Sequence, residues 1–142
     1  MTGLECLQLM AAGKIPPPSM GLTMQMQPVT VSADLIEFEA TAGDQHLNPA
    51  GAVHGGFAAT VLDTVTGCIV MCQLEDATIP YATLDLSIKM LRPIPRNEPL
   101  LAKGKLINLS KRTAVSEGHL YSADNKLLAH ATGVFIIQRK DT

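Results

Sequence analysis

The chain has 142 residues, enough for one domain with one sizeable hydrophobic core but not for two. Its 11 Lys and Arg nearly balance 13 Asp and Glu, which argues against nucleic acid or an anionic membrane surface as the main partner. Hydrophobic residues make up 46% and charged residues only 17%, a balance that also argues against disorder. So little charge suggests that part of the outside is buried against copies of the chain.

The N-terminal part of the chain is predicted to be a lead-in to the domain. Residues 1–13 have a weak helical pattern, which Gly13 and the Pro16-Pro17-Pro18 run end. Residues 14–27, rich in Pro and Met, are expected to be extended. We therefore divide the chain into a lead-in segment, residues 1–27, and a domain, residues 28–142.

No targeting or membrane segment is predicted. Met1 to Met10 lack the basic start and apolar centre of a signal peptide. The longest apolar stretch, residues 57–74, is interrupted by Asp63, Gln73 and several threonines. We expect a soluble cytoplasmic protein. Its cysteines, Cys6, Cys68 and Cys72, are expected to be small buried side chains that neither form disulfides nor bind zinc.

The middle of the chain predicts one strand and one long helix. Apolar residues alternate from about Val29 to Ala40, which indicates a strand, and a polar loop follows over Thr41–Gly51. From about Gly55 to Leu74 apolar residues recur at helical spacing on nearly every face. Such a helix is buried rather than on the surface. Asp63 is the single carboxylate on it, and it needs a partner or a task there.

After Pro80 the apolar residues alternate with polar ones, as in β-strands, up to the end of the chain. A strand is predicted up to Met90, with Ala82, Leu84 and Leu86 on one face, and a turn follows over Arg92–Asn97. Three more strands are expected at Leu100–Leu109, Thr113–Ser122 and Lys126–Gln138. One strand, one long helix and four antiparallel strands give an α+β fold with one helix against one sheet.

One segment carries residues suited to chemistry: Asn48-Pro49-Ala50-Gly51-Ala52-Val53-His54-Gly55-Gly56, followed on the helix by Asp63. Free N–H groups at a helix start and the positive end of its dipole suit an oxygen that gains negative charge. Asp63 lies eight residues beyond Gly55, or about 12 Å along a helix. One chain therefore cannot easily place both groups at one reacting carbon, whereas a dimer could.

Each of these residues also has a purely structural interpretation. Asp63 could be a helix carboxylate bonded to Thr60 or Thr66, and Asn48 an ordinary turn former. The glycines could simply allow tight packing. His46, His119 and His130 lack partners at metal or triad spacing and are interpreted as structural. There is no Gly-x-Ser-x-Gly elbow for serine-based acyl transfer.

The segment as a whole resembles the hotdog-fold acyl-CoA thioesterases of the PaaI-like type. Their signature is matched by Asn48, Gly51, His54-Gly55-Gly56 and Asp63, and the resemblance runs from about Val29 to Gln138. It implies an antiparallel sheet wrapped around one long central helix and the hydrolysis of an acyl-CoA thioester to free acid and CoA.

The resemblance also implies roles for individual residues. The amide of Gly55 would polarise the thioester carbonyl, with the Asn48 side chain close to the carbonyl or the water. Asp63 would act as general base on water or as nucleophile, and Thr83 would help to hold the water. His54 would either orient towards the thioester or fix the loop.

Partners are implied in the same way. Arg92, Arg96, Lys111 and Arg112 are the candidates for the CoA phosphates, although each could equally be a solvated surface residue. No metal or redox cofactor is implied, because CoA is part of the substrate. A homodimer or homotetramer with its active site at the subunit interface is expected. Two alternatives stay open: a hotdog hydratase or dehydratase, and a hotdog protein that binds acyl-CoA without turnover.

Overall fold

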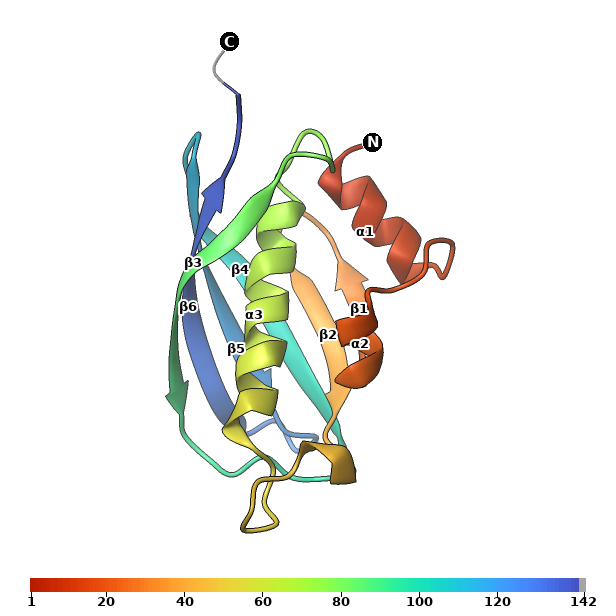
Figure 1. Cartoon of the computed structure of the whole chain (residues 1–142), viewed down its shortest axis with the longest axis vertical. Helices are drawn as coiled ribbons and strands as arrows, with labels where there is room; N and C mark the ends of the chain where they lie inside the picture. The colour runs from red at the N-terminus through yellow and green to blue at the C-terminus, as the bar shows by residue number, and fades with distance from the viewer. Residues whose placement is uncertain (141–142) are drawn as a thin grey trace.

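The computed structural model describes residues 1–140 and has a six-stranded antiparallel sheet that curves around one long helix, α3 (Gly55–Met71) (Figure 1). The strand order is β1-β2-β4-β5-β6-β3. The strands are β1 (Met26–Val31), β2 (Ile36–Thr41), β3 (Tyr81–Met90), β4 (Pro99–Leu109), β5 (Thr113–Tyr121) and β6 (Leu127–Ile137). Two short helices, α1 (Gly3–Ala11) and α2 (Ser19–Thr23), precede the sheet, and a 3-10 turn, Asp44–His46, follows β2. The predicted α+β class, with a sheet around one helix, is confirmed.

Helix α3 begins at a side-chain cap and is buried along most of its length. The His54 Nδ1 atom accepts a hydrogen bond from the Gly56 N–H at 2.7 Å. Phe57, Val61, Leu62 and Val65 are all buried between the helix and the sheet. The helix ends at Met71 with Cys72 as its C-cap, three residues before the predicted end at Leu74. Within residues 1–140, no helix is long and apolar enough to cross a membrane.

The single strand predicted over Val29–Ala40 is wrong, because the chain reverses direction within it. Residues 32–35 form a turn in which the Leu35 N–H donates to Ser32 Oγ at 3.0 Å and the Ser32 N–H to the Leu35 carbonyl at 3.1 Å. Serine in such a turn replaces strand hydrogen bonds by local ones. The sheet therefore has six strands where five were predicted.

Strand β3 also differs from its prediction, since its side chains change face half-way. The pairing with β6 shifts register between Thr83 and Asp85, which is a β-bulge. Leu84 is 59% exposed, whereas Leu86 packs against the core that it was predicted to share with Leu84. On the other side of the bulge, Thr83 reaches Asp63 on α3. The bulge thus turns Thr83 and Leu86 to the same side of the sheet.

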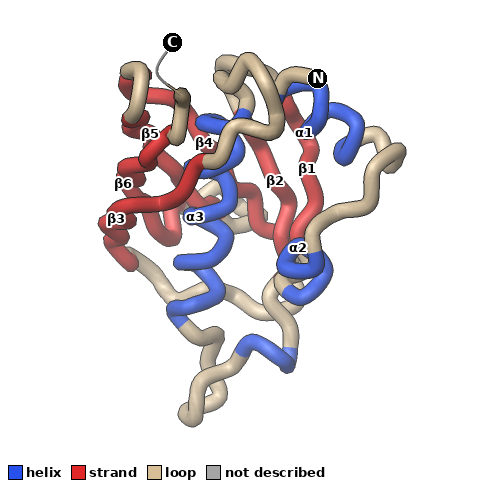
Figure 2. The backbone as a smooth tube through the Cα atoms, turned by 45° about the horizontal axis from the view of Figure 1, so that its top comes forward, coloured by secondary structure: helices blue, strands red, loops and turns tan. Residues whose placement is uncertain are grey.

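The N-terminal segment folds onto the sheet and α3, and the helical pattern of residues 1–13 is present as α1 (Figure 2). Helix α1 starts with a capping box, in which Thr2 Oγ1 accepts from the Glu5 N–H and Glu5 Oε2 from the Thr2 N–H. Leu7 of α1 is buried in the main core. Residues 19–23 form α2, although residues 14–27 were predicted to be extended. The division into residues 1–27 and 28–142 stays a prediction.

Gly104 marks the closest approach of helix and sheet, and its replacement gives a test of the packing. A Cβ atom at Gly104 would overlap the Val65 carbonyl of α3, so we expect Gly104→Ala to lower the free energy of unfolding by about 1–3 kcal/mol. A Cβ at Gly67 would instead meet Phe135 at 3.5 Å, an ordinary contact, and helix propensity favours Ala there. Urea unfolding should separate the two variants; equal stabilities would contradict the close approach.

Candidate functional site

The loop before α3 is held by Asn48. Its side-chain Oδ1 atom accepts from the Ala50 N–H at 3.0 Å and from the Ala52 N–H at 3.1 Å. The backbone N–H of Asn48 donates to the Ala52 carbonyl. Gly51 has a φ of 82°, a backbone conformation that favours glycine. The side-chain oxygen of Asn48 therefore shapes the loop, and only the amide nitrogen remains to meet a ligand.

The start of α3 leaves the Gly55 N–H free. His54 uses its ring to accept from the Gly56 N–H and its carbonyl to accept from the Phe57 N–H. Among residues 1–140, nothing accepts a hydrogen bond from the Gly55 N–H. Gly55 is exposed and lines an open hollow of about 340 Å³ that also includes Met90, Leu91 and Arg92; we call it the Gly55 hollow. A free N–H at a helix N-terminus can stabilise an oxyanion.

Asp63 lies in the middle of α3, and its carboxylate is held from β3. Thr83 Oγ1 donates to Asp63 Oδ1 at 2.8 Å. Within the described residues Oδ2 has no donor, so it is left to accept from water. Thr60 and Thr66, the partners of a purely structural Asp63, donate instead to backbone carbonyls. Asp63 and Thr83 line a second open hollow of about 310 Å³, the Asp63 hollow, together with Gly67.

The structure thus brings the predicted catalytic residues together in two groups rather than one. Asn48, His54 and Gly55 lie at the start of α3, and Asp63 and Thr83 lie about two turns further along it. Gly55 lines one hollow, and Asp63 and Thr83 line the other. Along α3, Gly55 and Asp63 are eight residues, or about 12 Å, apart.

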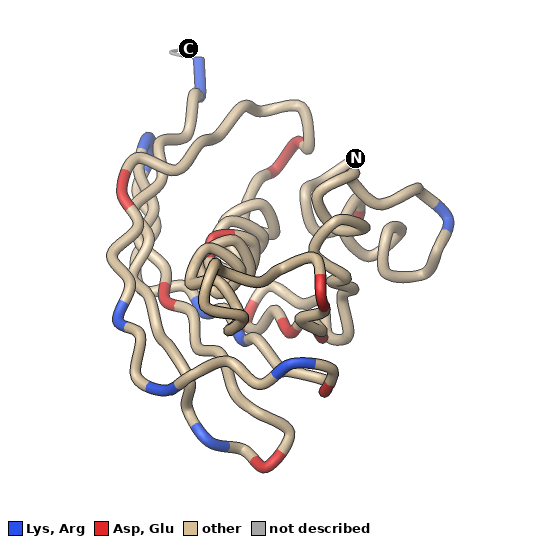
Figure 3. Tube along the Cα trace, turned by 60° about the horizontal axis from the view of Figure 1, so that its bottom comes forward, with Lys and Arg blue, Asp and Glu red and all other residues tan. Residues whose placement is uncertain are grey.

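The four basic candidates are divided between the two ends of the molecule. Arg92 lines the Gly55 hollow and donates from Nη1 to the Leu127 carbonyl at 2.7 Å, while Arg96 forms an exposed ion pair with Asp44 at 3.3 Å. Lys111 and Arg112 lie in the β4–β5 turn at the other end (Figure 1). Over the whole trace, basic and acidic positions are interspersed (Figure 3). Within residues 1–140, no group of three or more His, Cys, Asp or Glu side chains is arranged to hold a metal ion.

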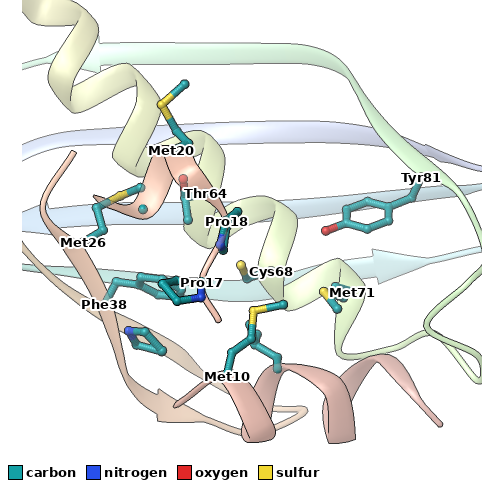
Figure 4. A pocket seen from close by; sticks show the side chains of 13 residues that line it. Met10, Pro17, Pro18, Met20, Met26, Phe38, Thr64, Cys68, Met71 and Tyr81 are labelled. Carbon is teal, nitrogen blue, oxygen red and sulfur yellow. The ribbon is translucent and has the colours of Figure 1, made fainter. Parts of the chain in front are cut away.

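An apolar cavity of about 190 Å³ lies between α3 and the N-terminal segment, and the sequence did not predict it. Figure 4 shows its lining side chains converging from several elements. We call it the Met–Pro cavity, after its lining residues Met10, Pro17, Pro18, Met20, Met26 and Met71. The one available signal was the concentration of Met and Pro in residues 10–28.

Two further lining groups of the cavity, Cys68 and Tyr81, are uncharged at neutral pH. Burial raises the pKa of the Cys68 thiol to about 12, with smaller contributions from Cys72 and Asp63. Burial likewise raises the pKa of the Tyr81 phenol above its ordinary value. Both groups therefore stay protonated, and the cavity wall carries no charge from them.

Comparison with known proteins identifies the family. A family model described as the thioesterase superfamily matches residues 50–129, a span that includes Gly55, Asp63 and Thr83. The chain belongs to the thioesterase superfamily. The predicted family and the predicted enzyme class, a thioester hydrolase, are therefore confirmed.

Individual relatives and solved structures agree with this assignment. A putative thioesterase from Ralstonia eutropha JMP134, described as a phenylacetic acid degradation-related protein, is 32% identical, with a TM-score of 0.82 over 92% of this chain and 98% of that one. Acyl-coenzyme A thioesterase 13 of Mus musculus is 26% identical over 80% of this chain and 75% of its own. The E. coli PaaI protein, 16% identical over 94% of each chain, shares the fold with a TM-score of 0.80. The hotdog architecture is thus confirmed for this thioesterase.

Proposed function

We propose that this thioesterase hydrolyses an acyl-CoA thioester to the free acid and CoA, with Asp63 as the base that activates water. The observation that carries the proposal is the Asp63 carboxylate: Thr83 holds it by one oxygen, and Asp63 lines an open hollow. The likeness to acyl-coenzyme A thioesterase 13 supports CoA esters as the substrate class.

The geometry suggests how the reaction proceeds. Water hydrogen-bonded to Asp63 loses its proton to the carboxylate as it attacks the thioester carbon. The negative charge that develops on the carbonyl oxygen is stabilised by the Gly55 N–H of a second subunit and by the dipole of its helix. The tetrahedral intermediate then collapses, the C–S bond breaks, and the CoA thiolate leaves and is protonated. If Asp63 is instead the nucleophile, water hydrolyses the resulting anhydride.

The remaining predicted residues position the reacting groups and form no covalent bond with the substrate. Thr83 orients the Asp63 carboxylate, and His54 fixes the start of α3, which aims the Gly55 N–H. The amide nitrogen of Asn48 is available to the carbonyl oxygen or the water. Of the four basic candidates, Arg92 is the best placed for a CoA phosphate because it lines the Gly55 hollow. Arg96, Lys111 and Arg112 do not line that hollow.

A homodimer is supported by the exposed edge of β3. This ten-residue strand ends the sheet, and it leaves Leu84 and Met90 exposed by 59% and 49%, followed by Leu91 at 51%. A long apolar edge presents unpaired N–H and C=O groups that can pair with a strand of another chain. The other edge, β1, is protected by Pro28, a register shift and the packing of α1 and α2. A second copy would cover β3 and complete the site, and two such dimers would form the predicted tetramer.

The release of CoA tests the proposal directly. The purified protein should release free CoA thiol from acyl-CoA substrates, which a thiol-reactive dye detects, and turnover should be far above the spontaneous rate. Tight binding of CoA esters without thiol release over a broad panel would instead indicate the non-catalytic binder. Addition of water to an enoyl-CoA without thiol release would indicate the hydratase.

A further inference from the structure

The Met–Pro cavity has the walls of a binding site for an apolar group. Its volume is about 190 Å³, and its lining comes from the N-terminal segment on one side and from α3 on the other. Met side chains are flexible and polarisable, so they adapt to apolar guests of different shapes. An apolar cavity of about 150 Å³ is known to stay dry and to take up benzene. A small apolar guest is therefore expected to displace little ordered water.

The cavity adjoins the place where Asp63 would act. Thr64, Cys68 and Tyr81 line both the Met–Pro cavity and the Asp63 hollow. Thr64 follows Asp63 directly in the chain, and Cys68 lies one turn further along α3. A group attached to a carbon beside Asp63 thus lies next to the cavity, with these three side chains common to both spaces.

We propose that the Met–Pro cavity receives the acyl group of the substrate and that residues 10–28 form its closed end, which limits the length of that group. The inference rests on the proposed acyl-CoA hydrolysis. Benzene has six carbons, so scaling from the cavity that holds it gives room for about seven or eight carbons in 190 Å³. The cavity therefore selects short to medium acyl groups against long ones.

Gly21 is the position from which this limit can be changed. It is buried in α2, lines the cavity, and has no positive φ. A Cβ there would have no neighbour closer than 3.8 Å, so Ala fits without strain, and a longer side chain has the cavity as its free space. Met20, the preceding residue, also lines the cavity and is half-exposed, so its truncation enlarges the cavity on that side. Leu22 is 71% exposed and does not line the cavity, which makes it the matched control in the same helix.

The experiment measures kcat/KM for straight-chain acyl-CoAs from acetyl to palmitoyl. For the wild type, kcat/KM should rise about fourfold for each buried methylene up to about eight carbons and fall beyond that. Gly21→Leu should lower the octanoyl-to-acetyl ratio at least tenfold, and Met20→Ala should move the optimum to longer chains. Leu22→Ala should leave the profile unchanged. A profile that is flat to palmitoyl, or a ratio that Gly21→Leu does not change, would overturn the proposal.

Binding separates this proposal from the proposed function. Calorimetry should show that octanoyl-CoA binds more tightly than acetyl-CoA to the wild type but not to Gly21→Leu. If that difference appears without any thiol release, the cavity holds the acyl group and the hydrolysis proposal is wrong. If hydrolysis occurs but neither binding nor rate depends on the cavity variants, hydrolysis stands and the acyl site is elsewhere. Should Gly21→Leu fail to fold, as judged by its circular dichroism, Gly21→Ala and Met20→Ala together still decide the outcome.

Discussion

Replacing Asp63 with Asn is expected to lower kcat at least about a hundredfold. The amide has nearly the shape of the carboxylate, and its oxygen can still accept from the Thr83 hydroxyl that now bonds Asp63 at 2.8 Å. What it cannot do is take a proton from water or attack a carbonyl. The loss should therefore appear in kcat rather than in KM, measured by thiol release from an octanoyl-CoA substrate.

Asp85→Asn is the matched control for this variant. Asp85 is exposed on the same strand as Thr83, just beyond the bulge, and it lines neither hollow. Both variants remove one carboxylate, so a general change in net charge would affect them equally. Near-normal turnover by a folded Asp63→Asn protein would refute Asp63 as base and as nucleophile alike.

The parts of this thioesterase that could be predicted from the sequence depend on local signals. The long helix follows from the periodicity of its apolar residues, and the free donor at Gly55 follows from its place at the start of that helix. The late strands agree with the predictions to within two residues at each end, because turn residues separate regular alternating runs. The family resemblance pointed to Thr83, and the structure places its hydroxyl on Asp63.

The parts that were missed depend on contacts between distant residues. The turn at residues 32–35 was hidden because the apolar alternation on either side of it differs only in phase. The bulge that exposes Leu84 is visible only in the pairing of β3 with β6. The Met–Pro cavity forms because Met10, Met20 and Met26 meet Thr64 and Cys68 across the fold. No spacing along the chain reports such a meeting.

Removal of the Gly55 N–H gives the second large expected effect. Proline at this position lacks the N–H but suits the first turn of a helix, where its fixed φ is already helical. His54, the residue before it, has φ −63° and ψ 136°, an extended conformation that a following proline favours. Gly55→Pro should therefore fold and lose about a hundred- to a thousandfold in kcat, the usual effect of losing one oxyanion donor.

Gly55→Ala is the control because it keeps the N–H. Its Cβ would lie 3.6 Å from Met90 Cε, an ordinary contact, so kcat should change little. Thermal unfolding of the three proteins checks that the helix start is intact. If Gly55→Pro folds and turns over normally, the Gly55 amide is not the oxyanion donor.

Mixing the two inactive variants tests whether one site takes residues from two subunits. In a dimer of one Asp63→Asn and one Gly55→Pro subunit, a shared site would pair the intact Asp63 of the second with the intact Gly55 of the first. Random exchange makes half of the dimers mixed, and each has one such site, so about a quarter of the wild-type activity should return. If each site belonged to a single chain, both subunits of a mixed dimer would stay inactive, and mixing would restore no activity. The separation of Gly55 and Asp63 along α3, about 12 Å, is the physical reason to expect recovery.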